Sequence, residues 1–182
     1  MDKDKIISAI KKAGKGIGQY LEIMDSFHST DVSTDREFQR KFNSFYRIRQ
    51  RTATWYKTYY SFMQKQKGNA PNFSTVLRYL HSELGRYEPS FSSKFVATHN
   101  PDLPIWDAFV LKNTGIKPPY YSDPKKLFKA EEQYKKIQSW YERHLMSDAG
   151  NLIVEIFNDI VPEHNNISKL KKIDFVLWQT RA

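Results

Sequence analysis

The sequence of 182 residues contains no cysteine. This absence excludes disulfide bonds, thiolate catalysis, and zinc or iron–sulfur sites with cysteine ligands. It is typical of proteins of the reducing cell interior, so we expect a cytoplasmic location, associated with the nucleoid if the source is bacterial. Long apolar runs are also missing, and the N-terminus lacks the apolar core of a signal peptide. We therefore expect no membrane partner.

Acidic residues are in the minority. The 20 Asp and Glu residues face 29 Lys and Arg residues, which gives a formal net charge of +9. A positive excess of this size favours polyanionic partners such as DNA or RNA, although a basic surface can also serve solubility alone. Hydrophobic residues make up 40% of the chain, enough for a buried core in a single domain over residues 1–182.

Signatures of metal and cofactor sites are absent as well. The five histidines are scattered, and none has the spacing of a metal site. No glycine-rich phosphate-binding loop, dinucleotide-binding fingerprint or serine-hydrolase elbow is present. We expect no metal ion and no small-molecule cofactor.

Apolar residues recur every three or four positions, and no segment alternates as a half-buried strand does. This pattern predicts an all-α protein with about eight to ten helices. We expect N-terminal helices over residues 1–30, a core over residues 35–115, and C-terminal helices over residues 125–182 that pack back on the core. Gly14, Gly16 and Gly18 weaken the first segment, which predicts two short helices or a frayed one.

The longest helical run covers residues 38–62 and has one apolar face. Thr52 and Thr54 are weak helix formers, so we expect a break near residues 49–54. Basic residues lie off the apolar face. They form either a binding surface or a solvated helix face, and the pattern favours neither.

Residues 88–119 predict a helix, a proline-bounded turn and a second helix. The second helix is expected over residues 105–114, with Asp107 in its first turn and Gly115 as its stop. An acid at this position commonly does no more than stabilise the helix dipole. The residues by themselves favour that structural role.

The order of residues 103–115, Leu-Pro-Ile-Trp-Asp and then an apolar helix ending at Gly115, resembles the core of the helix-hairpin-helix DNA glycosylase superfamily, to which endonuclease III belongs. Residues 172–179 are similar to the helix that closes such folds. The resemblance spans roughly residues 38–178. It implies a two-lobed helical domain that acts as a monomer on double-stranded DNA.

The resemblance also implies a chemistry. Asp107 falls at the position of the family's catalytic acid, which would make the chain an enzyme that flips out a damaged or modified base and hydrolyses its N-glycosidic bond. The loop that probes the duplex would consist of Arg47, Arg49, Gln50 and Arg51, with Gln50 filling the gap left by the base. The predicted pocket for the extruded base consists of Trp106, Tyr46 and Tyr120.

The hairpin departs from the family pattern. Its two glycines, whose amides hold a DNA phosphate, are replaced by residues 87–93, which contain none. The predicted phosphate contacts that remain are Ser90, Ser92, Ser93 and Lys94. Lys94 lies a few residues beyond the position of the family's Schiff-base lysine, so we expect a monofunctional enzyme. Two other interpretations stay open: a non-catalytic DNA-binding module of the same fold, and an all-α protein-interaction domain.

Overall fold

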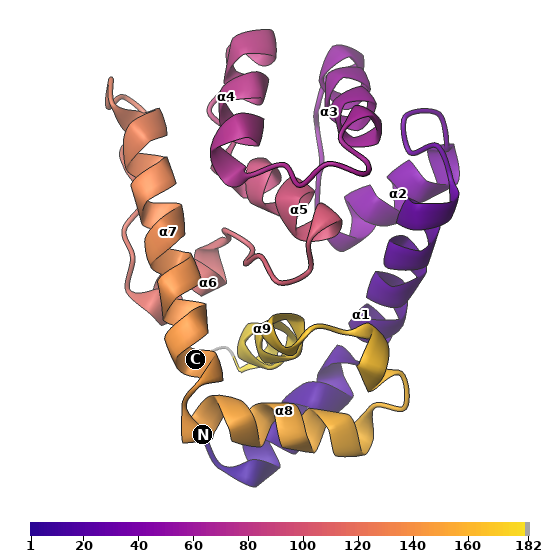
Figure 1. The fold of residues 1–182 in the computed structure, drawn as a ribbon, viewed down its shortest axis with the longest axis vertical. Helices are drawn as coiled ribbons and strands as arrows, with labels where there is room; N and C mark the ends of the chain where they lie inside the picture. The colour runs from indigo at the N-terminus through magenta and orange to yellow at the C-terminus, as the bar shows by residue number, and fades with distance from the viewer. Residues whose placement is uncertain (181–182) are drawn as a thin grey trace.

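The structure is a computed structural model that describes residues 1–180 (Figure 1). In chain order its elements are α1 (Lys3–Ser29), α2 (Arg36–Phe45), α3 (Ala53–Lys65), α4 (Phe73–Leu84), α5 (Pro89–His99), α6 (Ala108–Thr114), α7 (Lys126–Leu145), α8 (Asp148–Ile160), a short 3-10 helix η1 (His164–Asn166) and α9 (Lys169–Gln179). Over the described range there are nine α-helices and no strand, which confirms the prediction of an all-α protein. In that range no helix combines the length and the apolar character needed to cross a membrane.

The first helix differs from the sequence-based expectation. Instead of two short helices, α1 is one continuous helix of 27 residues that runs through all three glycines. Its buried face includes Ile6, Ile10, Ile17 and Tyr20, and it packs against α2, α8 and α9. Burial of this face offsets the low helix propensity of glycine, because tertiary packing supplies most of the stability of protein helices.

Gly14 offers a direct test of that balance. It lies on the exposed side of α1, and a Cβ added there would meet nothing within 4 Å. We expect Gly14→Ala to raise the free energy of unfolding by about 0.5–1 kcal/mol, because alanine loses less backbone entropy in a helix. Urea denaturation measures the change. A loss of stability would mean that α1 is not continuous at this point.

Local signals set most helix ends. The predicted break in the longest helical run is confirmed: α2 ends at Phe45, and α3 begins after Thr52, whose hydroxyl accepts a hydrogen bond from the Trp55 N–H at 3.1 Å. Gly85 ends α4 and Gly115 ends α6, both with the left-handed backbone that favours glycine, at φ 63° and 69°.

The last helix lies at the centre of the molecule. Figure 1 shows α9 between α1 and α7, with α8 crossing beneath it. It packs on α1, α6, α7 and α8, and its residues from Leu170 to Val176 are all buried. This position brings α9 next to the start of α6, where the candidate site begins.

Candidate functional site

A cavity of about 500 Å³ lies where α1, the end of α2, the start of α5, the start of α6 and α9 meet. This volume is in the range of small-molecule pockets. The wall carries six aromatic rings, four cations and two carboxylates, which are Phe45, Tyr46, Phe91, Phe109, Phe175 and Trp178; Lys15, Arg47, Lys94 and Lys171; and Asp107 and Asp174. Flat apolar rings together with positive charge suit an aromatic ligand that carries phosphate.

Asp107 is the N-cap of α6. The helix begins at Ala108, so the expected start at residue 105 is wrong, and the acid precedes the first turn. Its Oδ1 accepts hydrogen bonds from the N–H groups of Phe109 at 2.9 Å and Val110 at 2.8 Å, and its Oδ2 accepts one from Trp178 Nε1 at 3.1 Å. A carboxylate has about four acceptor positions. The carboxylate is thus fixed in orientation, with one position on Oδ2 left for a water molecule or substrate.

The surroundings of Asp107 raise the pKa of its carboxyl. Burial is the main cause, and the negative charge of Asp174 adds to it; together they outweigh the three N–H donors, which favour the ionised form. A carboxylate with a raised pKa is a better proton acceptor than an ordinary aspartate. Asp107 is therefore more basic than an exposed aspartate, and it lies in the cavity wall.

Lys94 lies on α5 and reaches the cavity wall. Its Nζ donates a hydrogen bond to the carbonyl oxygen of Tyr46 at 3.1 Å and lies 4.9 Å from the ring centre of Phe91. Burial lowers the pKa of the Lys94 ammonium to about 8, although the charges of Asp107 and Glu88 oppose the shift. Lys94 is thus a cation at neutral pH that loses its proton in mildly alkaline solution.

The lowered pKa of Lys94 makes stability depend on pH. Because the folded pKa lies below that of the unfolded chain, the unfolded state binds more protons between about pH 8 and pH 10.5, and stability rises with pH in that window. We expect Lys94→Met to be more stable than wild type at pH 7, with a difference that shrinks above pH 8. Urea denaturation from pH 7 to pH 10 measures it.

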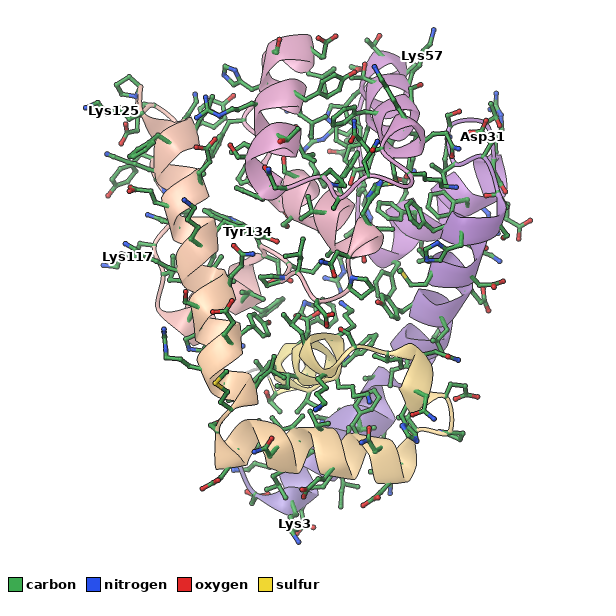
Figure 2. All side chains as sticks on the ribbon, viewed as in Figure 1. Lys3, Asp31, Lys57, Lys117, Lys125 and Tyr134 are labelled. Atoms are coloured by element: carbon green, nitrogen blue, oxygen red, sulfur yellow. The ribbon has the colours of Figure 1, made fainter. Side chains whose placement is uncertain are left out.

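Lys57→Met is the matched control, because Lys57 is exposed on α3 (Figure 2). Its effect on the free energy of unfolding is expected to be small and equal at every pH. A constant difference for Lys94→Met over the same range would show that the Lys94 ammonium is not buried.

The loop between α2 and α3 has an unusual backbone. Arg47 and Gln50 both have φ 55°, in the left-handed region that residues with a side chain rarely adopt. Ile48 lies between them with its side chain buried, and its N–H donates to the Asn43 carbonyl at 2.9 Å. Anchoring Ile48 in the core leaves Arg47, Arg49 and Gln50 exposed around it. Strain of this kind is concentrated at functional sites.

Trp178 joins this loop to the acid. The Arg47 guanidinium lies 4.9 Å from the centre of the Trp178 ring, and the indole N–H of the same ring donates to Asp107. Phe109 meets the ring edge-on, with ring centres 5.6 Å apart. The position of Arg47 and the orientation of the Asp107 carboxylate are therefore coupled through one side chain.

The second carboxylate of the cavity is already paired. Asp174 accepts from Lys171 Nζ at 2.6 Å and from the Tyr141 hydroxyl at 3.2 Å. Burial disfavours the Lys171 charge, but Asp174 and the other groups around it raise its pKa overall, so the pair is ionic. Among residues 1–180, Asp107 forms no ion pair within 4 Å. Asp107 is thus the carboxylate of the wall that remains available for chemistry.

The structure brings five of the predicted site residues together at the cavity: Asp107, Tyr46, Arg47, Ser90 and Lys94. The other two predicted base-pocket residues lie elsewhere. Trp106 is a core residue, 4% exposed and stacked on Phe73, and Tyr120 is 84% exposed on the loop after α6. Arg49 and Gln50 are exposed on the α2–α3 loop, outside the cavity wall.

The remaining predicted phosphate contacts are occupied within the protein. Ser92 and Ser93 are fully buried, and their hydroxyls donate to the carbonyl oxygens of Glu88 and Ser90 at 2.8 Å. Neither hydroxyl reaches a phosphate in this position. The buried carboxylate of Glu88 also holds Arg51 at 3.5 Å, while Arg86 binds it at 2.9 Å. In the region expected to replace the hairpin, Glu88, Ser92 and Ser93 are therefore engaged by groups of the protein itself, while Ser90 lies at the cavity wall.

The sequence did not reveal most of the aromatic wall. Trp178 and Phe109 contact each other and Asp107, yet they are separated in sequence by the whole of α7 and α8. The only signal was the similarity of residues 172–179 to a closing helix. In residues 1–180, no three His, Asp or Glu side chains are close enough to hold a metal ion.

The chain matches no protein-family model, no curated protein and no solved structure. The chemistry of the cavity is therefore the main guide to its function.

Proposed function

We propose that the protein excises a damaged or modified base from double-stranded DNA by hydrolysing its N-glycosidic bond. The observation that carries this proposal is Asp107: a carboxylate that forms no ion pair within residues 1–180, fixed by three N–H donors, in a cavity walled by aromatic rings and cations. The ring-lined wall suits a flipped base, and the cations suit the phosphates on either side of it.

Asp107 supplies the chemistry in this proposal. As the bond to the base breaks, positive charge develops on the deoxyribose at C1′, and an ionised carboxylate beside it stabilises that charge. The free position on Oδ2 receives a proton from the attacking water, since the raised pKa of Asp107 favours proton uptake. The water oxygen bonds to C1′ as the C1′–N bond breaks, and the base leaves with the electron pair of that bond and takes a proton from solvent. Asp107 then returns its own proton to solvent, so the products are the free base and an abasic site.

Arg47 and Lys94 contribute binding. Both are cavity-wall cations, and Arg47 is presented by the strained loop at the rim. Contacts from such side chains to phosphates position the DNA without reading its sequence. Each phosphate neutralised should steepen the fall of log affinity with log salt concentration by about 0.9.

Incubation with duplexes that each carry one altered base tests the proposal. The panel covers oxidised, deaminated, alkylated and hypermodified bases, and heating in alkali cuts the strand wherever a base has been lost. We expect strand cleavage for at least one duplex. Binding of every duplex without any base loss would favour the non-catalytic DNA-binding module, and absence of duplex binding at low salt would favour the protein-interaction domain.

A further inference from the structure

A second surface combines exposed aromatic rings with lysines. Tyr120 and Tyr121, on the loop between α6 and α7, are 84% and 66% exposed, and Phe128, in the first turn of α7, is 56% exposed. These are all of the strongly exposed aromatic side chains among residues 1–180. We call this surface the α6–α7 patch. None of its three rings lines the cavity described above.

The charge of the patch is positive. Residues 115–129 contain four lysines and one aspartate, and Asp123 is already engaged by an ion pair with Lys129 and by the Lys125 N–H at 2.8 Å. Lys126 Nζ lies 4.3 Å from the centre of the Tyr121 ring. Figure 2 shows Lys117 and Lys125 projecting from the same side of the molecule. Lysines thus outnumber acids in this segment, and Lys126 lies against an exposed ring.

This combination identifies the partner chemistry. Exposed rings stack on the faces of unpaired bases, and neighbouring lysines follow the phosphates of the same strand. A duplex hides its base faces, so it offers nothing to the rings. We infer that the α6–α7 patch binds single-stranded DNA, with Tyr120 and Tyr121 stacking on its bases. The choice of DNA rather than RNA rests on the proposed function, whereas single-strand binding follows from the patch itself.

The patch follows, in the sequence, the short helix that begins after Asp107. Asp107 caps the start of α6, and the loop with Tyr120 follows its end. Tyr120 lies six residues beyond the last residue of α6, and no residue of the patch lines the cavity, so strand binding by the patch and excision at Asp107 are tested separately.

Binding of a fluorescent oligo-dT to the full chain tests the inference by fluorescence anisotropy. We expect Tyr120→Ala/Tyr121→Ala to weaken binding about tenfold or more, because two stacking rings are lost. Tyr120→Phe/Tyr121→Phe keeps the rings and should stay within about twofold of wild type. Lys117→Ala and Lys125→Ala should each reduce the salt slope by about 0.7 if the lysine contacts a phosphate.

Two controls separate this site from the cavity. Met146→Ala removes an equally exposed side chain, 84% exposed, just beyond the far end of α7 and should leave oligo-dT affinity unchanged. Asp107→Asn should also leave it unchanged, so loss of excision and loss of strand binding are separate results. Duplex affinity should be the same in the Ala pair and in wild type.

Four results would overturn the inference. The first two concern oligo-dT: the Ala pair binds it as tightly as wild type does, or the Phe pair loses as much affinity as the Ala pair, which would point to the hydroxyls. In the third, the Ala pair loses as much affinity for duplex as for oligo-dT. In the fourth, sedimentation shows that the wild type is a dimer and that the Ala pair is a monomer. Tighter binding of oligo-rU than of oligo-dT would reject DNA as the partner.

Discussion

Asp107→Asn is expected to lower the rate of base excision by about 10²- to 10⁴-fold, the range found when a charge-stabilising or proton-accepting group is removed. Asparagine keeps the shape of the side chain, and its carbonyl oxygen can still accept the N–H groups of Phe109 and Val110. It can neither carry the negative charge nor take a proton from water. Single-turnover excision on the best duplex of the panel measures the loss.

The same substitution should not reduce stability. The pKa of Asp107 is raised in the folded state, so the folded chain binds more protons than the unfolded chain as pH rises through the window from 3.8 to the folded pKa. Stability is lost across that window, and the cost is complete above the folded pKa. Removing the charge relieves this cost and offsets the hydrogen bond from the Trp178 indole N–H, which is lost because the asparagine NH2 group takes the place of Oδ2. We expect a free energy of unfolding at pH 7 equal to or above that of wild type.

Asp102→Asn is the matched control, because Asp102 is an exposed acid in the loop between α5 and α6. It should keep both full excision and full stability. Full excision by Asp107→Asn would refute the assignment of Asp107. A marked loss of duplex affinity or of stability would instead show that its role is to hold α6 in place.

Gly150→Ala is expected to have the largest effect on stability. The start of α8 lies directly on the end of α7, and a Cβ at Gly150 would stand 1.9 Å from the His144 carbonyl oxygen and 2.8 Å from its carbonyl carbon. These are backbone atoms, so no side-chain rotation can relieve the overlap. Forcing extra atoms into a packed site costs about 1–3 kcal/mol, and the backbone clash places this substitution at or above the upper end.

Urea denaturation of Gly150→Ala measures the loss of unfolding free energy. Gly14→Ala is the natural comparison, since the same chemical change on the open side of α1 should have the opposite sign. Equal stability of Gly150→Ala and wild type would mean that the turn between α7 and α8 is wider than the structure shows.

Local features were predictable because they depend on near neighbours in the chain. The break after α2 and the stop at Gly115 follow from a capping group and a left-handed glycine within a few residues. The continuous α1 was missed for the opposite reason. Its glycines lower helix propensity locally, while the compensation comes from distant helices.

Burial was harder to infer than periodicity. Ser92 and Ser93 look like surface groups in the sequence, but α5 is enclosed on nearly all sides. All of its residues from Phe91 to Thr98 are buried except Lys94, which is partly exposed. Their hydroxyls bond instead to carbonyl oxygens of the preceding turn. In a segment as short as α5, the spacing of apolar residues does not distinguish a helix with one buried face from a helix that is buried on all sides.

The sequence by itself determined an all-helical chain with an excess of positive charge, no cysteine chemistry and an acid at the start of a short helix. Only the tertiary structure decided which charges are paired and which face a cavity. Lys171 neutralises Asp174, while Trp178 orients Asp107 from 71 positions away in the chain. Charge pairing and desolvation depend on contacts between residues far apart in sequence, so composition and periodicity cannot supply them.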